Sequence, residues 1–239
     1  FPVLDDSLII MGDQSLGFNH EIPKEGYNLY GTPAKTYETI SLSNNGIRGT
    51  GKIDFIHSHL FSDDFIYYSD SVTTDGYKGY IDPGQVKSLN FPQADLGNFR
   101  MSWYPRKDSM YLITIGEPFN FYTKSAQLEG TVNLTQAGVY GAGRFFTRGS
   151  ITESKQMTFE EKKFEARNSK FQILSDQIDQ PAMVGEDTYV NFNLDKNIAD
   201  INIENTRDAA FNFPYTAMKT SIVNATWFLE DSVVTMRKP

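Results

Sequence analysis

Two histidines and two aspartates lie close together in one part of the chain, and these residue types bind metal ions. His57 and His59 are two residues apart, so on a β-strand they would share a face. Asp63 or Asp64 would then add a carboxylate, which gives a ligand set of the kind that zinc accepts. The positions 92 residues later hold no histidine. We therefore interpret both histidines as solvated strand residues, and we predict no metal ion and no other cofactor.

Adjacent carboxylates occur at Asp5–Asp6, Asp63–Asp64 and Glu160–Glu161. Glycoside hydrolysis needs two carboxylates that face each other across a cleft. Neighbouring residues of a strand point to opposite faces, so none of these pairs forms such a dyad by itself. They are solubilising acids or, as the alternative, weak calcium ligands.

Aromatic residues supply a candidate ligand surface, because flat rings stack on sugar rings. The residues concerned are Phe65, Tyr67, Tyr68, Trp103 and Tyr104. Core packing and cross-strand pairing explain the same residues without any ligand. The sequence is compatible with both a ligand surface and core packing for these residues.

Nucleophilic and phosphate-binding motifs do not occur in the sequence. There is no cysteine, no Gly-x-Ser-x-Gly elbow, and only three histidines, so a histidine-based triad is not expected. Gly46, Gly49 and Gly51 lack the spacing of the dinucleotide fingerprint and are not followed by Gly-Lys-Ser/Thr. We interpret them as turn and bulge glycines, predict no catalytic residue, and lean against an enzyme.

Charge and hydropathy exclude two further classes of function. The formal net charge is −8 and the pI is about 4.9, whereas nucleic-acid-binding proteins need a basic surface. Apolar runs such as 110–115 are far shorter than the roughly 20 residues of a membrane-spanning helix. The chain has no initiator Met and no leader, so we expect a piece of a larger chain that contacts the remainder.

An internal repeat organises the sequence. Residues 27–81 align without a gap on residues 119–173, an offset of 92 residues with twelve identities. The identical positions in the first copy are Asn28, Tyr30, Ala34, Thr39, Leu42, Gly46, Gly49, Gly51, Ser58, Ser62, Lys78 and Ile81. A third start at 211 predicts four segments: the end of a preceding unit (1–26), unit 1 (27–118), unit 2 (119–210) and a truncated unit 3 (211–239).

Residue alternation predicts strands within each unit. Residues 39–52 read as strand, tight turn and strand, and the matching segment ends in Gly138, Gly141 and Gly143. Alternate glycines leave one strand face bare, so that another backbone or an aromatic ring can approach. Period-two alternation also predicts strands over 53–58 and 190–195. Residues 158–167 have a helix-forming composition, but their counterparts at 66–72 do not, so we predict strands in both units.

The predicted fold class is all-β, and two architectures accommodate a unit of 92 residues. A continuous β-solenoid or β-groove would stack several short rungs per unit in one sheet. Tandem β-sandwich modules of immunoglobulin type have a similar length. We favour the continuous sheet because no linker rich in Pro, Gly or Ser separates the units.

The motifs Gly-Ile-Arg-Gly-Thr-Gly (46–51) and Gly-Val-Tyr-Gly-Ala-Gly (138–143), with the aromatic segment 62–68, resemble very large repetitive envelope or surface proteins of Bacteroidetes. Segments 220–227 and 233–236 are also similar to theirs. The resemblance implies β-rich repeats at the cell envelope or extracellular surface, and it assigns no catalytic residue. A weaker likeness is to β-groove proteins that carry lipid across envelopes.

From these observations we expect a non-enzymatic structural or interaction segment of such a protein, with a protein or glycan partner. The alternatives are a carbohydrate-binding or carbohydrate-active β-helix, motivated by the aromatic and acidic residues, and a lipid-conveying β-groove.

Overall fold

The computed structural model describes residues 8–10, 16–86, 89–175, 179–205 and 211–237. The predicted all-β class is confirmed. Apart from the short 3-10 turns η1 (Pro105–Lys107) and η3 (Pro214–Thr216), the regular structure of the described residues consists of strands. No helix in these ranges is long and apolar enough to cross a membrane.

The chain forms two compact units, each made of more than one segment. The first unit comprises 1–82, 95–117 and 133–136, and the second comprises 83–94, 118–132 and 137–239. The predicted division at residues 27, 119 and 211 stays a prediction.

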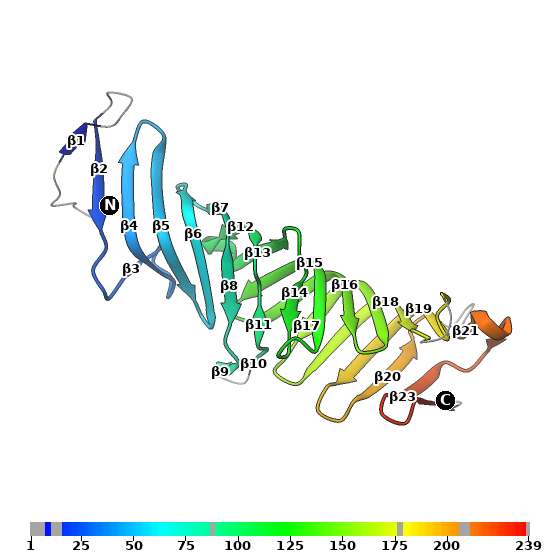
Figure 1. Cartoon of the computed structure of the whole chain (residues 1–239). Coiled ribbons are helices and arrows are strands. Elements are labelled where there is room, and N and C mark those ends of the chain that lie inside the picture. Colours follow the sequence, from blue (N-terminus) through cyan, green and yellow to red (C-terminus); the bar gives the residue numbers. More distant parts are fainter. Residues whose placement is uncertain (1–7, 11–15, 87–88, 176–178, 206–210, 238–239) are drawn as a thin grey trace. The chain divides into compact units, whose positions relative to one another are not determined.

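The first unit is built from antiparallel strands that follow one another along the chain (Figure 1). Strand β4 pairs with β2, β3 and β5, strand β6 pairs with β5, β7 and β8, and β12 lies between β7 and β13. The strands are β1 (Leu8–Ile10), β2 (Leu16–Glu21), β3 (Tyr27–Asn28), β4 (Lys35–Ser43), β5 (Gly46–Phe55), β6 (Ser58–Tyr67), β7 (Val72–Gly76), β8 (Lys78–Ile81), β12 (Phe99–Tyr104) and β13 (Ser109–Thr114).

The second unit is an antiparallel meander in which β16 to β20 pair in chain order and β20 then pairs with β23 (Figure 1). Its strands are β9 (Gly84–Val86), β10 (Leu89–Phe91), β14 (Phe119–Phe121), β16 (Gly138–Thr147), β17 (Ser150–Phe159), β18 (Lys163–Ile173), β19 (Met183–Asn193), β20 (Ile198–Ile203), β21 (Phe211–Phe213), β22 (Met218–Thr220), β23 (Asn224–Phe228) and β24 (Val233–Arg237). Two further strands, β11 (Ala94–Asp95) and β15 (Ala126–Thr135), contribute residues to both units.

The predicted hairpin at 39–52 is confirmed, because β4 and β5 are joined by a two-residue turn and pair from Ser43 opposite Gly46. The prediction of one strand over 53–58 is wrong beyond Phe55. Ile56 has a φ of +58°, which turns the chain back, and β6 begins at Ser58. Alternation alone did not reveal this turn, because an apolar residue occupies it. The prediction of strand over 158–167 is wrong for 160–162, because β17 ends at Phe159, the chain turns, and β18 begins at Lys163. Its counterpart over 66–72 is divided in the same way between β6 and β7.

The core of the second unit is a row of large side chains that crosses neighbouring strands, here named the interior row. Phe159 faces Phe164, Phe164 faces Phe192, and beyond Ala199 the row reaches Trp227. All five side chains are buried. The rings of Phe164 and Phe192 are stacked with their centroids 5.3 Å apart, and Phe192 meets Trp227 edge-on at 6.3 Å. Burial of this row stabilises the sheet, since each large aromatic removes about 150–250 Å² from water.

The two glycine motifs allow the close approaches that the sequence predicts. A Cβ atom at Gly49 would lie 2.9 Å from the ring of Tyr67, and one at Gly141 would lie 2.5 Å from the ring of Phe159. At Gly143 the neighbour is backbone, because a Cβ atom there would lie 2.2 Å from the carbonyl oxygen of Glu129. Positive φ angles occur at Gly46, Gly51, Gly138 and Gly143. No L-residue with a side chain fits these positions without strain.

Alkaline pH is expected to destabilise the first unit through Tyr67. Burial raises the pKa of Tyr67 to about 12, and its hydroxyl forms a hydrogen bond of 2.9 Å with Thr36. In the unfolded chain a tyrosine loses its proton near pH 10. Above pH 10 the folded state therefore holds more protons than the unfolded state, so the free energy of unfolding falls as pH rises. The loss amounts to about 2 kcal/mol between pH 10 and pH 12.

Urea titrations across this pH range measure the effect. The Tyr67→Phe variant has no proton to lose at this position. Its free energy of unfolding should therefore fall less steeply with pH, by the slope that one proton contributes. An unchanged slope in Tyr67→Phe would refute the assignment to this residue.

Candidate functional site

A β-bulge interrupts the β5–β6 hairpin of the first unit. Gly49 faces Phe65 and Gly51 faces Ser62, so one residue of β5 lies opposite two residues of β6. The two residues of β6 within the bulge are Asp63 and Asp64, which lie opposite Thr50. A bulge turns both side chains toward solvent, and both aspartates are exposed. The expectation that adjacent acids point to opposite faces fails here for this reason.

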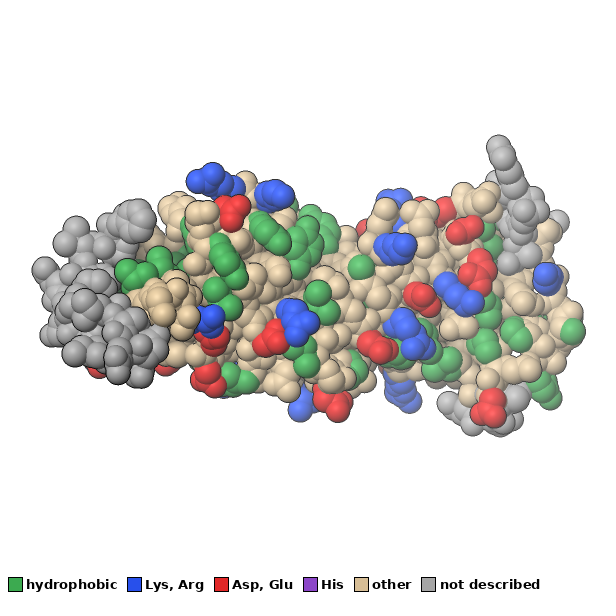
Figure 2. Space-filling model, turned by 90° about the horizontal axis from the view of Figure 1, so that it is seen from above, with side chains coloured by type: hydrophobic (Ala, Val, Ile, Leu, Met, Phe, Trp, Pro, Cys, Tyr) green, Lys and Arg blue, Asp and Glu red, His purple; other side chains and the backbone are tan. Residues whose placement is uncertain are grey.

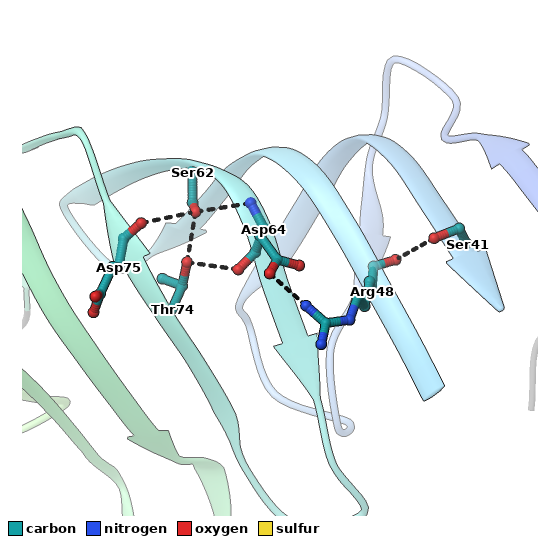
Figure 3. Close-up of polar contacts among 6 residues, drawn as sticks. All are labelled: Ser41, Arg48, Ser62, Asp64, Thr74 and Asp75. Carbon is teal, nitrogen blue, oxygen red and sulfur yellow. Dashed lines mark hydrogen bonds and ion pairs between the residues drawn. The ribbon is translucent and has the colours of Figure 1, made fainter. Parts of the chain in front are cut away.

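The hydroxyl of Ser62 holds the bulge together (Figure 3). It accepts a hydrogen bond from the backbone N–H of Asp64 at 3.0 Å and donates to the carbonyl oxygen of Asp75 at 3.3 Å. The hydroxyl of Thr74 lies 2.5 Å from Ser62 and donates to the carbonyl oxygen of Asp64 at 2.8 Å. Arg48 forms an ion pair with the Asp64 carboxylate on the outer side. Both Ser62 and Thr74 are buried, so these bonds satisfy groups that water does not reach.

The β16–β17 hairpin of the second unit contains the same bulge. Gly141 faces Met157 and Gly143 faces Ser154, again with one residue opposite two. Ser154 accepts from the N–H of Gln156 at 2.9 Å and donates to the carbonyl oxygen of Arg167 at 2.6 Å. Ser62 and its two partners, Asp64 and Asp75, lie 92 residues before Ser154 and its two partners. The bounds of β16 and β17 are likewise those of β5 and β6 displaced by 92 residues.

The histidine and acid pairs predicted as possible ligands are separated in space. His57 lies in the turn after β5, and His59 lies on β6 near Asp54 rather than near Asp63 or Asp64. Within the described ranges no group of three His, Cys, Asp or Glu residues is arranged to hold a metal ion. Asp5 and Asp6 lie outside the described residues.

A polar surface of the first unit lies on the outward side of β4, β5, β6 and β8, and is here named the outer ladder. Two cross-strand rows make it up. One row is Tyr37, Lys52, Phe61 and Lys78, and the other contains Asp54, His59 and Tyr80, with Asp82 just beyond β8. Cations alternate with rings in the first row, and this arrangement favours cation–π contacts.

The carboxylate of Asp54 is the centre of the ion network. It lies 2.9 Å from Lys52 Nζ and 2.7 Å from His59 Nδ1. The other ring nitrogen of His59 lies 3.3 Å from the carboxylate of Asp82. The contact with Asp54 is a hydrogen bond, and the contact with Asp82 is an ion pair when the imidazole is protonated. Partial burial raises the pKa of Tyr37, and the charge of Asp54 with a hydrogen bond to it adds to the rise.

The rings of the outer ladder lie next to one another. The centroids of His59 and Tyr80 are 4.7 Å apart, and those of Tyr80 and Phe61 are 6.1 Å apart with nearly parallel planes. Lys78 Nζ lies 5.1 Å from the centroid of the Phe61 ring. These side chains are half-buried or exposed, so ring surface and charge are presented to solvent together.

The aromatic ligand surface predicted from sequence does not form as one surface. Phe65 and Trp103 are fully buried, because they face the core from β6 and β12, and they cannot contact an external ligand. Tyr67 is half-buried, and its hydroxyl bonds to Thr36. Tyr68 is 51% exposed and Tyr104 is 36% exposed. Tyr104 packs edge-on against Tyr111 instead of joining the other four residues.

Sequence reasoning missed Tyr37, Phe61 and Tyr80. A signal for them was present, because strand alternation places Phe61 on the face opposite Leu60 and Ser62. What the sequence did not show is that β6 pairs with β8 as well as β5, which places Tyr80 beside His59.

Charges of both signs are interspersed on the face of the molecule that Figure 2 shows. Figure 2 shows Lys and Arg side chains beside Asp and Glu side chains, with hydrophobic ones between them. Ion pairs such as Arg100 with Asp75 and Lys162 with Asp195 account for part of this pattern.

Comparisons with known proteins supply no relative. No protein-family model, no curated protein and no solved structure matches the chain.

Proposed function

We propose that the chain is a non-enzymatic structural or interaction segment of a large repetitive bacterial envelope or cell-surface protein. The observation that carries the proposal is the hairpin with its serine-bonded bulge, which recurs with the same bounds and the same hydrogen bonds after 92 residues. Unrelated hairpins would not share bulge position, strand bounds and serine partners together. The envelope location rests on the resemblance of the glycine motifs.

The repeated hairpins keep their architecture while their surface chemistry changes. The bulge carries Asp63 and Asp64 in the first unit, but Lys155 and Gln156 in the second. Conservation of a scaffold with variation of its exposed residues supports a role in spacing or in binding, since a repeated catalytic site would keep its reactive groups. We propose that the units form a continuous β-solenoid or β-groove, with tandem sandwiches as the alternative.

Surface labelling of intact cells tests the location. An antibody raised against the chain should label unlysed cells of the source bacterium, and protease added outside should remove the signal. Signal that appears only after lysis, in the soluble fraction, would overturn the envelope assignment.

Carbohydrate binding is a second candidate function, favoured by the outer ladder. Adjacent rings of His59, Tyr80 and Phe61 provide stacking faces, and the carboxylates of Asp54 and Asp82 can accept hydrogen bonds from sugar hydroxyls. The ladder replaces the aromatic set predicted from sequence as the surface for this function.

A glycan array with a matched tyrosine pair tests this candidate. Binding that Tyr80→Ala lowers by up to roughly tenfold, and that Tyr111→Ala leaves unchanged, would support it, since loss of one ring contact costs about 0.5–1.5 kcal/mol. Tyr111 is the control because it is also an outward tyrosine of the first unit, 40% exposed. An array without binding or turnover would remove the candidate.

A further inference from the structure

A cavity of about 500 Å³ lies in the second unit, at the end of the interior row. This volume falls within the range of roughly 300–1,000 Å³ that small-molecule sites occupy. Its apolar wall includes Ile173, Met183, Phe213 and Val234, together with Trp227. The cavity is thus an opening onto the apolar interior of the sheet.

Trp227 connects the cavity with the core. Its indole is 6% exposed and packs edge-on against the rings of Phe171 and Phe192. On the cavity side, Gly149 lies beside the ring edge, since an added Cβ atom would be in van der Waals contact with it at 3.5 Å, and both residues line the cavity. A ligand in the cavity would therefore contact a rigid aromatic edge.

One cation stands at this cavity, which is lined by serine residues as well as apolar ones. Arg148 is the single charged residue among the described residues that line it, and its side chain is exposed. Within the described part of the chain Arg148 makes no hydrogen bond or ion pair, although the protein carries an excess of acids. A guanidinium binds a carboxylate with two parallel hydrogen bonds.

We propose that this cavity binds an amphipathic carboxylate, a molecule of the fatty-acid class, with its apolar body against Trp227 and its carboxylate on Arg148. The proposal is independent of the repeat and of the envelope location. It requires only the described residues of the second unit.

Trp227 provides the signal for a direct test. The chain has two tryptophans, and Trp103→Phe leaves Trp227 as the only one. This background should fold, because the indole N–H of Trp103 is buried and has no hydrogen-bond partner within the described residues. Decanoate is titrated into it while tryptophan emission is recorded, and decyltrimethylammonium, with the same chain and the opposite charge, is the ligand control.

Three variants locate the site. Arg148→Gln should weaken decanoate binding roughly tenfold, the effect expected for loss of a charge-assisted hydrogen bond. Ala182→Phe fills the cavity from an exposed lining position and should abolish the saturable signal. Arg106→Gln, an exposed arginine of the first unit, should change nothing. Circular dichroism verifies that each variant is folded.

Either of two results would overturn the proposal. One is the lack of any saturable change in Trp227 emission with decanoate. The other is equal binding of both amphiphiles together with an unaffected Arg148→Gln variant, which would show an apolar surface without selectivity for carboxylates.

Discussion

Replacing Gly143 by alanine should destabilise the second unit by about 3 kcal/mol or more. The new Cβ atom would lie 2.2 Å from the carbonyl oxygen of Glu129 and 2.9 Å from the Cα atom of Gly130, both of which are backbone atoms of a paired strand. Backbone cannot move aside as a flexible side chain can. A residue other than glycine at a φ of +135° adds strain of about 1–3 kcal/mol.

Gly138→Ala is the matched control for this variant. Gly138 has a φ of +136°, nearly that of Gly143, but an added Cβ atom there meets nothing closer than the Tyr140 hydroxyl at 3.8 Å. Its cost should be the strain alone, about 1–2 kcal/mol. Chemical denaturation of both variants gives the difference. Equal losses would mean that the close backbone approach at Gly143 contributes nothing.

Phe164→Ala should cost about 4 kcal/mol, because it opens a cavity in the middle of the interior row. Phe164 is fully buried, lies opposite Phe159 and Phe192, and its ring centroid is 4.6 Å from that of Phe145. Unfolding of the second unit should therefore occur at much lower denaturant concentration in this variant.

Phe146→Ala is the control, since Phe146 follows the buried Phe145 in β16, is only half-buried, and packs under Arg144 at 5.0 Å. Its loss should be about 1 kcal/mol or less. A Phe164→Ala variant no less stable than Phe146→Ala would contradict the assignment of the core to this row.

Local sequence signals predicted the local structure well. The pattern of Ile40 and Leu42, followed by two asparagines and a glycine, predicted the β4–β5 hairpin, and the spaced glycines predicted close approach by rings and backbone. These features depend on alternation and on the missing glycine side chain, and both are visible in a single sequence.

Pairing between distant strands could not be predicted from the same signals. The second partner of β6 is β8, and this pairing creates the outer ladder. The burial of Phe65 and Trp103 depends on which face of β6 and β12 becomes the core. The bulge at Gly51 reverses the alternation within β6, so Asp63 and Asp64 become exposed together. Each of these outcomes follows from tertiary register, which residue types alone do not determine.

An experimental structure of the chain that traces strands through residues 110–125 tests the central claim most directly. The account predicts one sheet that continues without a break through this segment, with residues 35–67 superposing on residues 127–159 and both serine-bonded bulges in register. Separate closed sandwiches, or different strand registers in the two hairpins, would contradict it.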